Sequence, residues 1–314
     1  MAEGFGEALR ERVLVLDGGL SNQLRAQGCD LSGELWSARL LADDPGQIRA
    51  AHAAYLRAGA QVLISASYQA SRRGFAGRGL GAAEADRLAG RSVALAREAA
   101  ERAGRPGRRV WVAGSVGPYG AVLADGSEYR GRYGLGMGEL IAFHRPRIEA
   151  LAAAGPDVLA LETVPDTVEA EALLRAAEGC GVPVWLCYTV AGGRTRAGQP
   201  LAEAFAVAAG NDQVVAVGVN CCDPREVTGA VRRAVAATGK PAVAYPNSGE
   251  DWDRVALRWR GPSRFAAAAG ARAGEWAAAG ARLIGGCCRV GPEDIAALAA
   301  GPGPAPGGKR FPNC

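Results

Sequence analysis

The sequence predicts an α/β fold, a single-domain (β/α)8 barrel of the TIM type that covers residues 1–300. Three observations predict it: short β-rich apolar runs, helix-like stretches between them, and polar residues where the runs end. Strands that are apolar throughout are typical of a parallel sheet covered on both faces. An open doubly wound sheet is the alternative, but the first run ends in "DGGLSNQL", which is not a G-x-G-x-x-G phosphate turn.

Strand-like and helix-like segments alternate in order along the chain. Pro45 is well placed to open the first of the regular helices. The tail "GPGPAPGGKRFPNC", residues 301–314, is Gly/Pro-rich, and we expect it to be flexible. The predicted strands are 12–19, 61–68, 109–120, 157–164, 182–190, 214–222, 241–249 and 281–288. The predicted helices are 45–58, 84–103, 139–154, 166–178, 200–209, 224–237 and 264–279.

Composition excludes several classes of protein. The net charge of +4 is spread thinly, with no basic stripe interleaved with aromatic residues, which argues against nucleic-acid binding. No run of eighteen apolar residues indicates a membrane span, and the N-terminus does not resemble a signal peptide, so we expect a cytoplasmic protein. Eight cysteines in 314 residues are too few for a disulfide framework, and we expect free thiols or metal ligands. The oligomeric state is not predicted.

Polar side chains gather at the ends of the predicted strands. In a parallel barrel these carboxyl ends converge on one face, where the active sites of such enzymes lie. Residues far apart in the sequence would therefore be neighbours in space. The polar strand ends are Asp17, Ser65, Ser67, Ser115, Glu162, Thr163, Asn220, Cys221, Asn247, Cys287 and Cys288.

Three of these cysteines indicate a catalytic metal site. Cys221 ends the sixth strand, and Cys287 and Cys288 end the eighth. Three thiolates and one open position suit a catalytic zinc ion, whereas buried, inert cysteines are the alternative. Adjacent residues of a regular strand face opposite ways, so the backbone must leave strand geometry before both sulfurs reach one ion. Gly285 and Gly286 allow this departure and a close approach of other groups.

The motifs resemble those of the homocysteine S-methyltransferases, a family that includes betaine–homocysteine methyltransferase. The resemblance covers almost the whole chain, and two segments, "SASYQAS" and "GPYGAVLADGSEYRG", look most like the branch that uses S-methylmethionine. The segments that carry it, in family order, are "LDGG", "LWSA", "AGAQVLISASYQAS", "VAGSVGPYGAVLADGSEYRG", "FHRPRIEAL", "LALETVP", "VGVNC", "YPNSGE" and "GARLIGGCCR".

The resemblance implies roles for individual residues. Cys221, Cys287 and Cys288 fall on the zinc-ligand positions, and Asp17 and Glu162 fall on the acidic positions that hold the amino group of homocysteine. Asn220 precedes the first ligand, as in the family, and is taken as a substrate-binding residue. Cys222 stands where relatives need no cysteine, and we place it outside the metal shell because a fourth thiolate would close the site.

The same residues make chemical sense for methyl transfer. A thiol becomes a good nucleophile when a metal binds it as thiolate. A sulfonium donor such as S-methylmethionine, or more slowly S-adenosylmethionine, loses a neutral thioether, so no acid is needed. Attack is an in-line displacement in which the protein supplies mainly orientation and activation, and methionine is the product.

Other groups near the predicted mouth are candidates for binding the substrates. Backbone N–H groups at Gly18 and Gly19 are candidates for the homocysteine carboxylate, although a plain turn is the alternative. A sulfonium cation is attracted to aromatic faces, and Tyr68 and Trp36 are the preferred pair. Loop 125–134 is a candidate lid or an ordinary solvated loop. The aromatic candidates in full are Trp36, Tyr68, Tyr119, Tyr129, Tyr133 and Tyr245.

Three alternative functions stay open. Selenocysteine or selenohomocysteine as acceptor, or betaine as donor, would keep the same chemistry. A redox or metal-binding thiol protein would explain the cysteines but not Asp17 and Glu162. A zinc hydrolase would need a general base near the metal, and Glu162 is the one candidate among the residues singled out.

Overall fold

The computed structural model describes residues 3–301, apart from residues 34, 105–106, 254–257, 264 and 266–268. The predicted flexible tail lies outside the described residues except for Gly301. No described helix is both long enough and apolar enough to cross a membrane.

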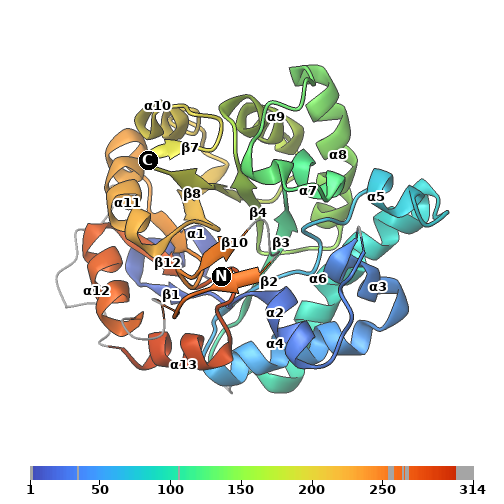
Figure 1. Ribbon diagram of the computed structural model, residues 1–314, viewed down its shortest axis with the longest axis horizontal. Helices are drawn as coiled ribbons and strands as arrows, with labels where there is room; N and C mark the ends of the chain where they lie inside the picture. The colour runs from blue at the N-terminus through green and yellow to red at the C-terminus, as the bar shows by residue number, and fades with distance from the viewer. Residues whose placement is uncertain are drawn as a thin grey trace.

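Eight parallel strands form a nearly closed barrel, with helices around the outside (Figure 1). The order around the sheet is β1-β12-β9-β8-β5-β4-β3-β2, and a bridge from Leu16 to Val62 joins the last strand to the first. All eight predicted strands are confirmed. They are β1 (Leu14–Val15), β2 (Val62–Ile64), β3 (Trp111–Val116), β4 (Val158–Val164), β5 (Val184–Tyr188), β8 (Val214–Asn220), β9 (Ala242–Tyr245) and β12 (Ala281–Ile284).

The predicted helices are also present, and their described ends lie within a few residues of the expected ones. The predicted start of the last helix, residue 264, lies outside the described residues. They are α4 (Pro45–Ala58), α6 (Ala82–Ala103), α8 (Met137–Ala153), α9 (Thr167–Ala177), α10 (Leu201–Ala206), α11 (Pro224–Thr238) and α12 (Ala269–Ala279). The helices not predicted are α1 (Phe5–Glu11), α2 (Leu20–Ala26), η1 (Trp36–Arg39), α3 (Leu40–Asp43), α5 (Arg72–Ala76), α7 (Tyr119–Leu123), η2 (Ser127–Tyr129) and α13 (Pro292–Ala300).

Local sequence explains where the outer helices begin and end. α4 starts with Pro45 at its first position and ends at Gly59, whose φ of 109° only glycine adopts readily. α11 follows the same plan, with Pro224 near its start and Gly239 at φ 68° after its end. Its start is capped by Asp223, which accepts a hydrogen bond from the Arg225 N–H at 2.8 Å. These signals set the length of the crossovers and so the positions of the strand ends.

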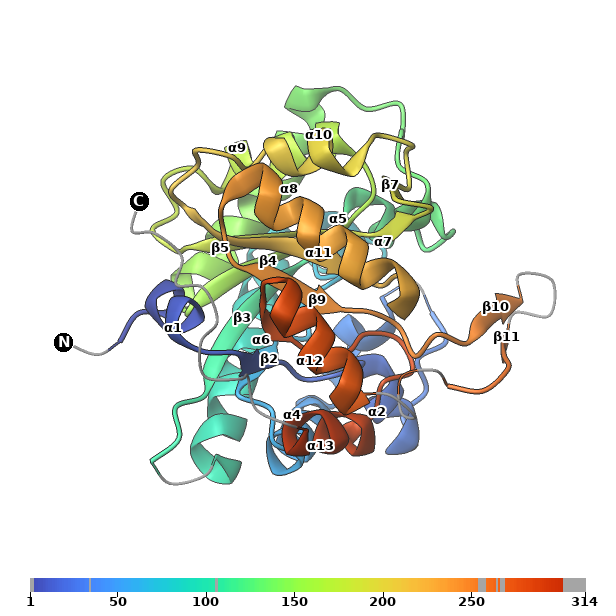
Figure 2. The ribbon, with the colours of Figure 1, turned by 90° about the vertical axis from the view of Figure 1, so that its left-hand side faces the viewer.

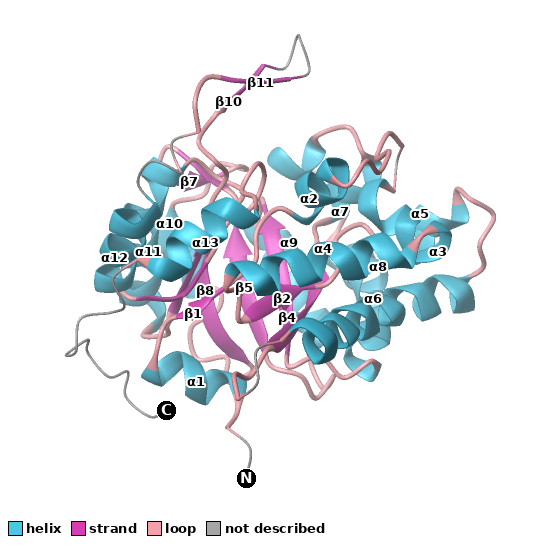
Figure 3. Ribbon diagram, turned by 90° about the horizontal axis from the view of Figure 1, so that it is seen from below, coloured by secondary structure: helices cyan, strands magenta, loops and turns pink. Residues whose placement is uncertain are grey.

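The amino-terminal end of the barrel is closed by α1. Phe5 packs edge-on against Trp111 at a centroid distance of 5.4 Å and lies 6.1 Å from Trp185, so aromatic side chains fill this end. Figure 3 shows α1 below the strands and the β10–β11 hairpin (Asp251–Asp253 and Arg258–Arg260) at the opposite end. A second hairpin, β6–β7 (Val190–Ala191 and Arg194–Thr195), follows β5. The open face therefore lies at the carboxyl ends of the strands.

Candidate active site

The structure brings the three predicted cysteine sulfurs together at the carboxyl ends of β8 and β12. The sulfurs of Cys221, Cys287 and Cys288 all lie within 4.8 Å of one another, and Cys221 Sγ is 3.9 Å from Cys288 Sγ. Cys221 is buried and the other two are half-buried. Cys222 is not part of the cluster, because its side chain is fully buried in the hydrophobic core. Three soft donors from two strands match the ligand set of a thiolate-bound metal.

Cys221 and Cys287 are joined by a disulfide in this structure. This differs from the expectation of free thiols or metal ligands throughout. The physical reason is proximity, because the Cα atoms are 5.5 Å apart, a separation that a disulfide bridges without backbone movement. The same proximity serves a metal once the pair is reduced, since thiolates and not a disulfide are the metal ligands.

The backbone leaves strand geometry before the cysteine pair, as the sequence predicts. β12 ends at Ile284, and a Cβ at Gly285 would lie 2.4 Å from Leu16 Cβ and 2.7 Å from the Asp17 carbonyl oxygen. A Cβ at Gly286 would lie 2.1 Å from Val290 Cγ1. Close approach, not a left-handed φ, is what requires glycine at both positions.

Neighbouring groups then hold the cysteine pair in place. The Cys288 N–H donates to Asn247 Oδ1 at 3.1 Å, and the Cys287 N–H donates to the Pro246 carbonyl at 2.8 Å. The Ser248 N–H donates back to the Cys288 carbonyl at 3.0 Å. The segment after β9 therefore fixes the orientation of two sulfurs on the next strand.

Two buried acids lie on the same face of the barrel. Asp17 Oδ2 accepts a hydrogen bond from the Ile64 N–H at 2.9 Å, but Oδ1 is buried with no hydrogen-bond partner. Burial, together with the nearby charge of Glu162, raises the pKa of Asp17 well above its usual value. An unpartnered buried carboxylate oxygen is a site that a cationic ligand would complete.

Glu162 is held from both sides. Ser115 Oγ donates to Oε1, and the Tyr245 hydroxyl donates to Oε2 at 3.0 Å. Burial raises the pKa of Glu162 to about 7, while these two hydrogen bonds and the charge of Arg147 oppose the rise. Tyr245, one of the aromatic candidates for the donor, is instead a buried partner of this acid.

Asn220 contacts the end of β4 through its side-chain amide. Its Oδ1 accepts from the Thr163 N–H and its Nδ2 donates to Thr163 Oγ1, both at 2.7 Å. Thr163 has a φ of 60°, an uncommon conformation for a β-branched residue. The amide of Asn220 therefore fixes the backbone next to Glu162 with one donor and one acceptor, and its contact with substrate stays a prediction.

The two glycines predicted to bind a carboxylate differ from each other. The Gly19 N–H donates to the Val290 carbonyl at 2.9 Å, so it is already engaged. A Cβ at Gly18 would lie 2.4 Å from that same carbonyl oxygen. Close packing against the turn after β12 accounts for both glycines, and carboxylate binding at Gly18 stays a prediction.

Trp36 and Tyr68, the predicted aromatic pair, make no ring contact with each other in the described part of the chain. Trp36 lies in η1 with 37% of its surface exposed and a φ of 42°. Burial raises the pKa of Tyr68, and Tyr129 and Glu128 are close enough to Tyr68 to raise it further. The partner of Tyr68 at the mouth is therefore Tyr129, in η2 of the loop predicted as a lid.

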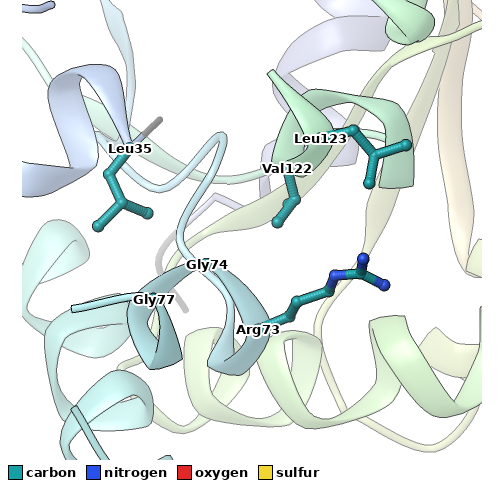
Figure 4. Close-up of a pocket in the computed structure, with 6 residues that line it drawn as sticks. All are labelled: Leu35, Arg73, Gly74, Gly77, Val122 and Leu123. Atoms are coloured by element: carbon teal, nitrogen blue, oxygen red, sulfur yellow. The ribbon is translucent and has the colours of Figure 1, made fainter. Parts of the chain in front are cut away.

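A small pocket of about 220 Å³ lies outside this cluster (Figure 4). Its walls come from the segment before η1, from α5 and from α7, with Arg73 donating to the Tyr119 hydroxyl beside it. None of the predicted site residues lines it. The lining residues are Leu35, Arg73, Gly74, Gly77, Val122 and Leu123.

The comparison with known proteins identifies the family. The family model for homocysteine S-methyltransferase matches residues 14–301. A homocysteine S-methyltransferase of Escherichia coli K12 is 47% identical over 296 residues, which cover 93% of this chain and 96% of that protein. The chain belongs to the homocysteine S-methyltransferase family. Homocysteine S-methyltransferase 4 of Zea mays is 45% identical, over 91% of this chain and 88% of that one.

Solved structures of the family superpose on the whole barrel. The oxidised form of the homocysteine methyltransferase MmuM from Escherichia coli has a TM-score of 0.80 at 45% identity, covering 92% of this chain and 95% of that one. Its metallated form has a TM-score of 0.79, with 92% and 96% covered. As a member of this family, the protein is a methyltransferase. The metallated form of the Escherichia coli relative and the cluster of three sulfurs in this chain point to a bound metal.

Sequence reasoning missed the groups that support the site. Asn247 and Ser115 were recognised as polar strand ends, but their partners, Cys288 and Glu162, follow only from the three-dimensional arrangement. Glu128 and Arg196, described below, lie in loops after β3 and β5, where no periodic pattern distinguishes them from solvent-exposed charges.

Proposed function

We propose that this protein uses zinc to transfer a methyl group from S-methylmethionine to homocysteine, forming methionine, with S-adenosylmethionine as a slower donor. The observation that carries the proposal is the gathering of three sulfurs within 4.8 Å on the same barrel face as two buried acids. A thiol protein without a substrate has no need of Asp17 and Glu162 at this place.

The residues present fit a zinc ion. Three cysteine thiolates are soft donors, and they leave a fourth position open. Zinc at this place would lower the pKa of the homocysteine thiol, so that its sulfur reacts as thiolate. The metallated structure of the Escherichia coli relative supports a metal in the family, and zinc is our proposal for its identity.

Asp17 and Glu162 would bind the ammonium group of homocysteine. Asp17 contributes the oxygen that lacks a partner, and Glu162 is oriented by Ser115 and Tyr245. Ammonium binding would favour the charged forms of both acids and so offset the burial that raises their pKa values. Holding the amino acid end would direct the sulfur toward the cysteines.

The transfer itself needs no acid from the protein. The homocysteine sulfur forms a bond to the methyl carbon while the bond from that carbon to the sulfonium sulfur breaks, and the electron pair leaves with a neutral thioether. The chain therefore has to align donor and acceptor and exclude water. Tyr68 and Tyr129, which lie near each other, would be the aromatic rings that face the sulfonium cation.

A donor panel tests this function. Reduced, zinc-loaded protein and homocysteine are offered S-methylmethionine, S-adenosylmethionine or betaine, and methionine is measured. We expect methionine from S-methylmethionine first. No methionine from any donor would contradict methyl transfer, and methionine from betaine alone would contradict the choice of donor. Selenohomocysteine in place of homocysteine measures the acceptor range.

The remaining expectations belong to the same proposal. The barrel of residues 1–300 would act as one catalytic domain, with residues 301–314 outside its core. A cytoplasmic location would suit the thiols, because a reducing compartment keeps Cys221 and Cys287 available to a metal. Immunodetection in separated cell fractions tests the location.

A further inference from the structure

Glu128 is a buried acid at the barrel mouth that has no part in the roles assigned above. It lies in η2 with 6% of its surface exposed, and its Oε2 is buried without a hydrogen-bond partner. Burial raises its pKa, and the nearby charge of Asp125 raises it further. Within the described part of the chain, no ion pair compensates this carboxylate. Such a group is costly to bury unless a ligand completes it.

Arg196 is a cation at the same place with similarly incomplete contacts. It follows β7, and its Cζ lies 5.5 Å from the centroid of the Tyr129 ring. Its Nε is buried with no hydrogen-bond partner. Burial raises the pKa of the Cys222 thiol, next to Cys221 in the chain, and the positive charge of Arg196 is close enough to oppose that rise. Arg196 therefore faces the mouth and not the outer surface of its hairpin.

Tyr129 connects these two charges to the metal site. It follows Glu128 in the chain, lies beneath Arg196, and is close enough to the Cys288 thiol that the two groups affect each other's pKa. Figure 2 shows α7 and β7, which precede the two loops concerned, at the same end of the barrel. An anion, a cation and an aromatic face thus lie near one of the three sulfurs.

We propose that Glu128 and Arg196 bind the amino acid end of the methyl donor, Glu128 its ammonium group and Arg196 its carboxylate, with the sulfonium against Tyr129. This inference rests on the proposed function. A pair of opposite charges matches a zwitterion, and the homocysteine ammonium already has Asp17 and Glu162. Tyr68 feels the charges of both Glu128 and Glu162, so it lies between the two acid sites.

The pair would make the donor site selective for amino acid sulfonium compounds. Betaine has a carboxylate but no primary ammonium group, so Glu128 would stay unpartnered in its complex. A site built to hydrogen-bond a group rejects analogues that lack it, because its buried polar atoms are left unpaired. The preference for an amino acid donor would then come from Glu128, and not from the sulfonium alone.

Two variants and two donors test the assignment. Glu128→Gln and Arg196→Met are compared with wild type, using S-methylmethionine and dimethylsulfoniopropionate, which has the sulfonium and carboxylate but no ammonium. The second compound is measured as a donor or, if turnover is too slow, as a competitive inhibitor. Glu203→Gln, an exposed position in α10, is the matched control for loss of a carboxylate. Metal content and Tm are measured for every variant.

We expect Glu128→Gln to raise KM for S-methylmethionine about ten-fold or more and to leave the constant for dimethylsulfoniopropionate within about two-fold. Arg196→Met should weaken both compounds, and neither variant should change KM for homocysteine. Unchanged donor constants, equal losses with both compounds for Glu128→Gln, or a rise in KM for homocysteine would each overturn the assignment. If Glu128→Gln fails to fold, Glu128→Asp replaces it, because the shorter side chain keeps the negative charge but moves it away from the ligand.

The controls separate this inference from the proposed function. Wild-type protein that makes no methionine from any donor would contradict the function itself. Wild-type protein that makes methionine, beside variants that match it with both donors, would contradict only the amino acid subsite.

Discussion

Asn220 and Thr163 are joined by two hydrogen bonds of 2.7 Å that use both ends of the Asn220 amide. The pair links the end of β8, one residue before Cys221, to the end of β4, one residue after Glu162. The first cysteine of the metal site and an acid of the substrate site are thus positioned by one contact.

Asn220→Ala should therefore damage both halves of the site. It leaves the buried N–H of Thr163 without a partner, which costs about 1–3 kcal/mol of stability. We expect KM for homocysteine and metal affinity to worsen together. Thr163→Val removes only the hydroxyl and keeps the N–H bond, so it should have the smaller effect in unfolding and kinetic measurements. Equal effects would contradict the positioning role.

Cys287→Ala should abolish metal binding and activity. Wild-type protein, reduced before loading, should hold about one zinc ion per chain, since the ligands must be thiolates. Cys222→Ala removes a neighbouring sulfur outside the cluster and should keep the metal. Metal analysis after dialysis distinguishes the two, and full zinc content in Cys287→Ala would argue against the ligand set.

The rate should depend on the charge of Glu162. Its raised pKa of about 7 means that the free enzyme gains the carboxylate as the pH rises through that value. Because we propose that this carboxylate binds the homocysteine ammonium, we expect kcat/KM for homocysteine to rise over the same range. Glu162→Gln should lower kcat/KM and remove this rise from the pH profile.

Ser115→Ala provides a directional check on that profile. The Ser115 hydroxyl donates to the Glu162 carboxylate and so favours its charged form. Without it, the pKa of Glu162 should rise further, and the ascending limb should move to higher pH. A shift to lower pH would contradict the hydrogen bond as the cause.

The free energy of unfolding of the ligand-free protein should also reflect Glu162. A carboxyl whose pKa is raised on folding stabilises the fold while it is protonated in the folded state. We expect stability to fall as the pH rises from about 4.5 to about 7, the interval between the unfolded and folded pKa values. Denaturant titrations of wild type and Glu162→Gln over this range measure the difference in slope.

Gly286→Ala should displace the cysteine pair. The added Cβ would lie 2.1 Å from Val290 Cγ1, and all three nearest contacts are with the Val290 side chain. Overpacking of this kind costs about 1–3 kcal/mol. We expect weaker metal binding in Gly286→Ala and partial recovery in the double variant with Val290→Gly, which removes all three contacting atoms. No recovery would indicate a conflict with the backbone.

The strand ends could be predicted from the sequence because a parallel barrel brings them together wherever they lie in the chain. This placed Cys221, Cys287 and Cys288 correctly side by side, and it placed Asp17 and Glu162 on the same face. The disulfide between two of the cysteines was not expected. Strand position indicates that sulfurs meet, but not whether they bond to each other or to a metal.

The sequence could not predict which polar residues at the strand ends contact one another. Asn220 was interpreted as a substrate contact because it precedes Cys221, yet its amide is used by Thr163. Trp36 was preferred over Tyr129 as the aromatic partner of Tyr68, yet the loop after α7 brings Tyr129 there. Loop conformation and side-chain direction determine such partners, and the sequence pattern reports neither.

The pairing of β1 with β12 has a consequence for synthesis of the protein. Asp17 follows a strand that lies beside residues 283–284, and most of the barrel is synthesised between the two. Until β12 is made, the nascent sheet has two unpaired edges, β1 and β9, and edges of this kind pair readily with other chains. A chain that stops before β12 would therefore lack two cysteines of the site and would also expose a surface prone to aggregation.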